Sequence, residues 1–136
     1  MSEVQRTLVL LKPDAYQRGF IGAIISRFEK KGLILEKMEL MNLSVDKAVS
    51  HYAEHEGKDF YNNLIAFITS DKLVALILSG ISAVHVVRIM CGATNSAEAE
   101  AGTIRGDYSL SNSRNIIHSS DSAESAQREI DIFFPI

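Results

Sequence analysis

The sequence contains little of what several protein classes require. Its single cysteine, Cys91, excludes an internal disulfide and a cysteine-based zinc centre, and we expect a buried thiol in a reducing compartment. With 14 Lys and Arg against 17 Asp and Glu, the net charge of −3 argues against a broad nucleic-acid-binding surface. No apolar run approaches the roughly 18 residues of a membrane span, and residues 1–6 lack the basic start of a secretion signal. We therefore expect a cytoplasmic protein without a membrane segment.

Short motifs of several enzyme classes are also absent. The sequence has neither a Gly-x-x-x-x-Gly-Lys-Ser/Thr phosphate loop nor a Gly-x-Gly-x-x-Gly fingerprint. No Gly-x-Ser-x-Gly elbow occurs, so Ser119 and Ser120 are poor candidates for nucleophiles. His51 and His55 have the spacing of a helical metal site, but the glutamate of a metalloprotease motif is missing, and exposed histidines are the more ordinary interpretation.

The remaining composition is typical of one soluble domain. A chain of 136 residues, 46% hydrophobic and 23% charged, can bury a core without disulfides or a structural metal. Short apolar runs predict strands at 7–11, 33–41, 72–79 and 115–118. Apolar residues at helical spacing predict helices at 21–31, 44–57, 60–68, 81–90 and 123–133. The predicted strands and helices alternate irregularly along the chain, which predicts a two-layer α/β sandwich. The patterns leave the pairing of the strands open.

A long segment without periodicity lies between Gly92 and Ser113. Because a loop of this length inside a compact domain is usually functional or disordered, we treat the motifs within it as candidate functional motifs. Gly102 and Gly106 flank Thr-Ile-Arg, and such glycines permit tight turns that present one guanidinium, that of Arg105.

The segment from Arg114 to Ser122 is the most informative part of the chain. A short apolar run brings His118 to a turn, and the following Ser-Ser-Asp-Ser contains good N-cap residues for a helix that carries Glu129. A helix N-terminus favours anions, and an imidazole placed there can act as a nucleophile towards a phosphoryl group.

Single hydrogen-bond donors stand at element ends and in loops. Each has an ordinary explanation, such as a solvated lysine or an arginine that complements a helix C-terminus. Together they could surround phosphates with side-chain donors, each charge-assisted bond contributing about 1.5–3 kcal/mol. The donors are Lys12, Tyr52, Arg88, Thr94, Arg105 and Asn115.

Three motifs together closely resemble the nucleoside diphosphate kinase family. They are Lys12-Pro-Asp, Gly-Thr-Ile-Arg-Gly-Asp at 102–107 and Asn115-Ile-Ile-His-Ser-Ser-Asp-Ser, and the resemblance runs from about Gln5 to Phe134. It implies a single domain over 1–136 with a ferredoxin-like two-layer sandwich, an antiparallel four-stranded sheet with helices on one face. It also implies a hexamer, or a tetramer, built from dimers.

The activity implied by the resemblance is transfer of the γ-phosphoryl of ATP to nucleoside diphosphates. The reaction runs in two half-reactions through phosphohistidine, with Mg²⁺ carried on the nucleotide. His118 is then the nucleophile through Nδ1, Glu129 holds the other ring nitrogen, and Ser120 steadies Glu129. Lys12 and Tyr52 meet the transferred phosphoryl.

The resemblance also assigns the nucleotide-binding residues. Arg88, Thr94 and Arg105 contact the neighbouring phosphates, Asn115 bonds the ribose, and Phe60 stacks on the base. Glu54 and Asp121 are placed near the metal, through waters.

Several positions depart from the family's usual residues, although no catalytic group is lost. Ser119 replaces glycine directly after the nucleophile, and a positive φ there would strain a serine. The other departures are Asp59, Ser96 and Ala101 at positions where prolines are common, Glu54 for aspartate, and Asn112 for an apolar residue.

Two other functions compete with the enzymatic one. A regulatory relative would bind nucleotide without turnover, but His118, Lys12, Arg105 and Glu129 are all intact. A nucleic-acid-binding relative is disfavoured by the net charge of −3.

Overall fold

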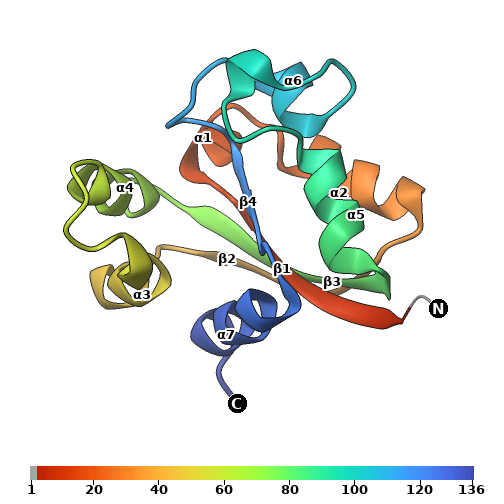
Figure 1. Ribbon diagram of the computed structural model, residues 1–136, viewed down its shortest axis with the longest axis horizontal. Coiled ribbons are helices and arrows are strands. Elements are labelled where there is room, and N and C mark those ends of the chain that lie inside the picture. Colours follow the sequence, from red (N-terminus) through yellow and green to blue (C-terminus); the bar gives the residue numbers. More distant parts are fainter. Residues whose placement is uncertain (1–2) are drawn as a thin grey trace.

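A four-stranded antiparallel sheet lies at the centre of the computed structural model, which describes residues 3–136 (Figure 1). The strand order is β2-β3-β1-β4, so the short strand β4 is an edge that pairs only with β1. The strands are β1 (Val4–Leu11), β2 (Ile34–Met41), β3 (Leu73–Ile81) and β4 (Ile117–Ser119). The antiparallel sheet and the α+β class expected from the sequence are confirmed.

Seven α-helices and two 3₁₀ turns connect and cover these strands within residues 3–136. They are α1 (Pro13–Gln17), α2 (Ile21–Lys31), α3 (Val45–His51), η1 (Ala53–His55), α4 (Tyr61–Ile68), α5 (Ala83–Cys91), η2 (Ser96–Glu98), α6 (Ile104–Tyr108) and α7 (Ala123–Phe133). In the described part of the chain, no helix has the length and apolar character that a bilayer crossing requires.

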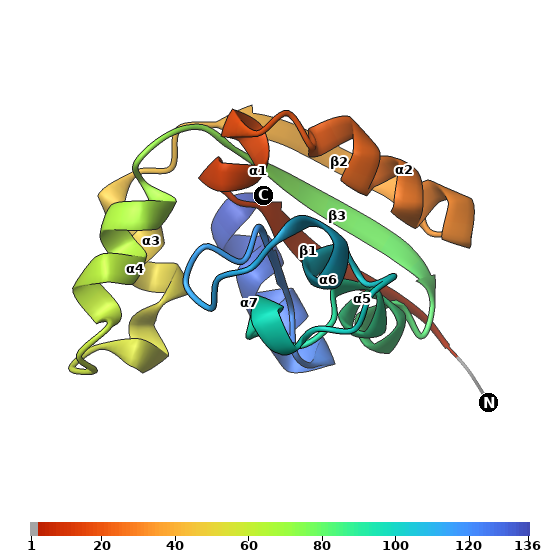
Figure 2. The same cartoon turned by 90° about the horizontal axis from the view of Figure 1, so that it is seen from above.

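The sheet is covered on both faces, whereas the sequence led us to expect helices on one. Val9 and Leu11 of β1 point into a cluster with α2 and α5, and the alternate residues Leu8 and Leu10 point into a second cluster with α3, α4 and α7. Figures 1 and 2 show α7 and α2 on opposite sides of the sheet. The continuous apolar run of β1 already indicated two buried faces, because a half-exposed strand would alternate.

Local signals in the sequence fix several helix ends as expected. Gly32 ends α2 in the left-handed conformation with φ +104°, which a residue with a Cβ rarely adopts. Ser44 caps α3 by accepting a hydrogen bond from the backbone N–H of Lys47, and Ser122 caps α7 by accepting one from Ser125.

The expected loop between Gly92 and Ser113 contains two helical segments, η2 and α6. In α6 the Thr103 hydroxyl accepts a hydrogen bond from the Gly106 N–H and so caps the helix. A threonine at this position is a helix-start signal that apolar periodicity does not detect. The five-residue helices α1 and α6 are too short to show a 3.6-residue repeat. The helix expected to run to Gly57 ends at His51, and the chain continues through the single 3₁₀ turn η1.

Candidate active site

The turn before β4 is held by residues that follow β1. The backbone N–H of Lys12 donates to the Ile116 carbonyl, and the buried Asp14 carboxylate accepts from the Ile116 N–H, each at 3.0 Å. Ile116 adopts φ +69°, and within residues 3–136 only Ser82 is another non-glycine residue with positive φ. A β-branched residue in this conformation is strained, and the two hydrogen bonds to the Ile116 backbone offset that strain.

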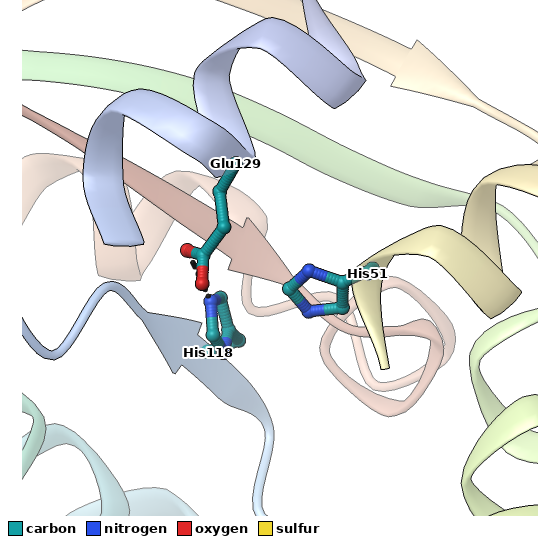
Figure 3. A group of neighbouring side chains, drawn as sticks. All are labelled: His51, His118 and Glu129. Atoms are coloured by element: carbon teal, nitrogen blue, oxygen red, sulfur yellow. Dashed lines mark hydrogen bonds and ion pairs between the residues drawn. The ribbon is translucent and has the colours of Figure 1, made fainter. Parts of the chain in front are cut away.

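His118 lies in β4 opposite Leu10 and faces a carboxylate on α7 (Figure 3). Its Nε2 lies 2.8 Å from Glu129 Oε1, and the Ser120 hydroxyl donates to the same oxygen at 2.7 Å. Ser120 is itself completely buried and accepts a hydrogen bond from the Leu8 N–H at 3.3 Å. The hydrogen bond to Glu129 therefore fixes the ring, and Nδ1 is the nitrogen left for a substrate.

The environment of Glu129 keeps its carboxylate ionised. Burial raises the pKa of Glu129, but the opposing hydrogen bonds and charges of His118, Ser120 and Arg128 together leave that pKa below its usual value. An ionised carboxylate at Nε2 favours a proton on that nitrogen and a free lone pair on Nδ1.

A second histidine packs against His118, which the sequence did not predict. The rings of His51 and His118 lie edge to face with centroids 4.6 Å apart, and His51 is only 3% exposed. The expectation of an exposed His51 is therefore wrong, because α3 turns this side chain inward together with Ala48, three residues earlier. Burial, and then the charges of His118, Lys12 and Arg128, hold the pKa of His51 well below its usual value.

Lys12 and Tyr52 are buried beside this pair. Lys12 Nζ donates to Asn115 Oδ1 at 2.8 Å, and burial, with a further contribution from the charge of Arg105, lowers the pKa of Lys12 to about 8. Burial, and then the charge of Glu129, raises the pKa of Tyr52 to about 12, so its hydroxyl stays protonated. Asn115 donates in turn to the carbonyl oxygens of Thr94 and Asn112.

Arg105 is a structural link as well as a candidate anion-binding group. Its guanidinium donates to the carbonyls of Gly92, Asn115 and Ile117 at 2.8, 3.3 and 2.7 Å. An arginine has five N–H donors, so two remain for a ligand. The helix that carries it depends on Gly106, where a Cβ would lie 1.9 Å from the Glu100 carbonyl oxygen.

The other expected ligand-binding side chains are more exposed. Arg88 donates to the Ser119 carbonyl at 3.3 Å, and Thr94 is exposed. Phe60, 47% exposed before α4, lines a pocket of about 400 Å³ with Phe67 and Arg114.

The two carboxylates expected near a metal are also exposed. Glu54 lies in η1 with Oε1 3.8 Å from His55 Nε2. Asp121 lies before α7, where a hydrogen bond with Ser125 lowers the pKa of its carboxyl.

Ser119 does not have the positive φ that would have strained it. It lies in β4, is 2% exposed, and is not among the positive-φ residues of the described chain. The strain is at Ile116 instead, three residues earlier.

Comparisons with known proteins agree with this geometry. A family model described as nucleoside diphosphate kinase matches residues 5–136. A curated nucleoside diphosphate kinase from a Nocardioides species is 56% identical over 130 residues, 96% of each chain. The structure of a halophilic nucleoside diphosphate kinase from Halobacterium salinarum in complex with CDP superposes with a TM-score of 0.96. It is 43% identical and covers 98% of this chain and 90% of that chain. An apo nucleoside diphosphate kinase from Encephalitozoon cuniculi gives a TM-score of 0.95 at 36% identity, covering 97% and 90% of the two chains.

Proposed function

The chain belongs to the nucleoside diphosphate kinase family, and from this premise we propose that His118 carries the phosphoryl group between nucleotides within a single domain spanning 1–136. The observation that supports this most is the 2.8 Å contact between His118 Nε2 and Glu129 Oε1. It directs Nδ1 away from the carboxylate and leaves its lone pair for an electrophile.

In the first half-reaction, the Nδ1 lone pair forms a bond to the γ-phosphorus of a nucleoside triphosphate such as ATP. The bond from that phosphorus to the bridging oxygen breaks, and the nucleoside diphosphate leaves with the electron pair. In the second half-reaction, a terminal β-phosphate oxygen of another nucleoside diphosphate attacks the phosphohistidine, and the N–P bond breaks. One pocket thus serves the donor and the acceptor in turn.

Glu129 offsets the positive charge that the ring gains when Nδ1 is phosphorylated. Ser120 donates at 2.7 Å to the same Glu129 oxygen that bonds to His118, so the carboxylate needs little reorganisation during transfer. Lys12 and Tyr52 present an ammonium and a protonated hydroxyl to the transferred phosphoryl.

The remaining donors bind the rest of the nucleotide. Arg88, Thr94 and Arg105 contact the neighbouring phosphates, with Arg105 limited to the two N–H groups that its carbonyl contacts leave free. Asn115 bonds the ribose, and the exposed ring of Phe60 stacks on the base. Stacking accepts any base, because every base has a π face.

Kinases of this family generally use a divalent metal, and Mg²⁺ fits the residues present. Mg²⁺ prefers oxygen ligands and keeps several waters. The exposed carboxylates of Glu54 and Asp121 suit contact through those waters, with the phosphates as the main ligands. The ion supplies charge neutralisation on the phosphates.

We further propose a cytoplasmic homo-oligomer, a hexamer or a tetramer, built from dimers. The edge strand β2 supports this, because Ile34, Met38 and Leu40 are 63%, 58% and 54% exposed on it. An exposed apolar edge strand offers both hydrogen bonds and hydrophobic contact to a second copy.

Incubation with γ-labelled ATP tests the proposal. We expect acid-labile, base-stable label on the protein, release of that label to an added nucleoside diphosphate, and no label on His118→Ala. Failure of the unmodified, folded protein to take up label would support a regulatory relative without turnover. Steeply salt-dependent binding to a long duplex would instead favour nucleic-acid binding.

A further inference from the structure

His51 is a buried imidazole to which the proposed reaction gives no role. Both of its ring nitrogens are buried and have no hydrogen-bond partner among residues 3–136. Buried polar atoms are normally paired, because losing contact with water without a new partner is unfavourable. Neither ring nitrogen of His51 is committed to another group of the described chain, so either is available as a ligand atom.

The groups around His51 are those that bind transition metals. One ligand atom from each of His51, His118 and Glu129 lies within 4.8 Å of the other two (Figure 3). They come from α3, β4 and α7, so the fold brings together residues that are far apart in the sequence. Two imidazoles and one carboxylate form a common three-residue zinc ligand set.

We propose that His51, His118 and Glu129 bind a borderline transition-metal ion, with Zn²⁺ as the representative, and that the bound ion blocks phosphoryl transfer. A site with three protein ligands takes water as the fourth, and water reaches this one beside His118, whose side chain is 22% exposed. This site differs from the proposed Mg²⁺ site in its ligands, since Mg²⁺ prefers oxygen atoms and Zn²⁺ accepts imidazole nitrogen.

The ligand atoms must move closer together to bind one ion. Zn²⁺ binds nitrogen and carboxylate oxygen at about 2.0–2.2 Å, so the atoms must move closer than their present 4.8 Å limit. Arg128 and Lys12 lie near the site and oppose a cation, which moderates the affinity.

Metal binding and phosphoryl transfer exclude each other, and this part of the proposal rests on the proposed function of His118. An ion at Nδ1 occupies the attacking lone pair. An ion at Nε2 takes the place of the proton that bonds to Glu129, so the neutral ring carries its proton on Nδ1 and that nitrogen has no lone pair for attack. Either arrangement prevents formation of phosphohistidine.

Titration calorimetry of metal-free protein with Zn²⁺ alone tests the site. We expect one ion per chain for the unmodified protein, no comparable binding of Mg²⁺, and a loss of affinity of about tenfold or more in His51→Asn. The matched control is His85→Asn, which alters an exposed histidine on α5 and should keep the affinity of the unmodified protein. A second control, His55→Asn, tests the His55–Glu54 pair as a competing site.

A second measurement keeps the proposal testable if His51→Asn does not fold. X-ray absorption of the unmodified protein with one equivalent of Zn²⁺ should show nitrogen and oxygen ligands at about 2.0–2.2 Å, with two imidazoles. Equal Zn²⁺ affinity in folded His51→Asn, loss of binding in His55→Asn, or no imidazole in the absorption spectrum would each overturn the proposed site.

The inhibitory effect has its own readout. Zn²⁺ should lower labelling by γ-labelled ATP in the unmodified protein and in His85→Asn, and should lower it far less in His51→Asn. Zinc binding without any effect on labelling would contradict the regulatory part alone. Absence of labelling in zinc-free protein would contradict the proposed function and leave the calorimetric result as the test of the site.

Discussion

In the proposed reaction, the hydrogen bond between His118 and Glu129 selects the reacting nitrogen. The carboxylate at 2.8 Å from Nε2 leaves Nδ1 as the nucleophile only if the carboxylate is ionised and accepts a hydrogen bond from Nε2–H. A neutral amide of the same size can instead donate to Nε2, which moves the ring proton to Nδ1 and removes the lone pair.

We therefore predict that Glu129→Gln lowers the rate of phosphohistidine formation by about 100-fold or more, because a wrong histidine tautomer has effects of this order or larger in other enzymes. Rapid quenching with labelled ATP measures this rate. Arg128→Gln is the matched control, since Arg128 approaches the other carboxylate oxygen only at 3.6 Å. A rate for Glu129→Gln within about twofold of the unmodified protein would contradict the tautomer argument.

Lys12 gives the site a pH dependence. Burial lowers the pKa of Lys12 to about 8, so in the free protein its charge is present below that pH and lost above it. We predict that kcat/KM for ATP, measured on the unphosphorylated protein, falls as pH rises above about 8.

Lys12→Arg is the control, because a guanidinium stays charged over the same range. The decline above pH 8 should be absent in that variant, whatever its absolute rate. The same decline in both proteins would assign it to another group.

The site residues differ in how readily the sequence predicts them. His118, Ser120 and Glu129 lie within one short strand–helix unit, so a local motif identifies them together. His51 was missed because its contact with His118 arises from packing of α3 against α7, which no local pattern encodes. The structural contacts of Arg105 with three carbonyls were missed for the same reason.

At the scale of secondary structure, α1 and the turn before β4 act as one unit. The Asp14 carboxylate accepts the Ile116 N–H at 3.0 Å and so holds a strained residue directly before the strand that carries His118. Apolar periodicity and caps predicted most of the longer strands and helices, except that the helix expected over 44–57 ends at His51. Short helices such as α1 and α6 were not predicted, because their position depends on such tertiary contacts.

We predict that Asp14→Ala lowers the free energy of unfolding by about 1–3 kcal/mol, because it leaves the buried Ile116 N–H without an acceptor. Urea unfolding at neutral pH measures this. Asp46→Ala, which alters an exposed first-turn carboxylate of α3, should change the stability by about 0.5 kcal/mol or less. Equal stability of the two variants would show that the Asp14–Ile116 contact does not define the turn.

At the scale of the whole molecule, the sheet leaves one apolar edge uncovered. Both faces of β1 and β3 are buried under helices, but β2 is exposed along most of its length. The sequence predicted β2 as a strand and could not show that it is an edge, because strand order follows from long-range pairing.

We predict that Met38→Glu shifts the protein to smaller species in sedimentation velocity, because a two-fold interface places the new charges of both copies close together. Val45→Glu, an equally exposed apolar position on α3, should leave the sedimentation coefficient unchanged. A Met38→Glu protein that sediments like the unmodified one would exclude this edge as the dimer interface.

The most direct test of the central claim is nuclear magnetic resonance of the histidine rings after a single turnover with ATP. We predict one phosphoryl group per chain, bonded to Nδ1 of His118, and its complete transfer to an added nucleoside diphosphate. A phosphoryl group on Nε2, on another residue, or one that no diphosphate removes would contradict the assignment of His118 Nδ1 as the carrier.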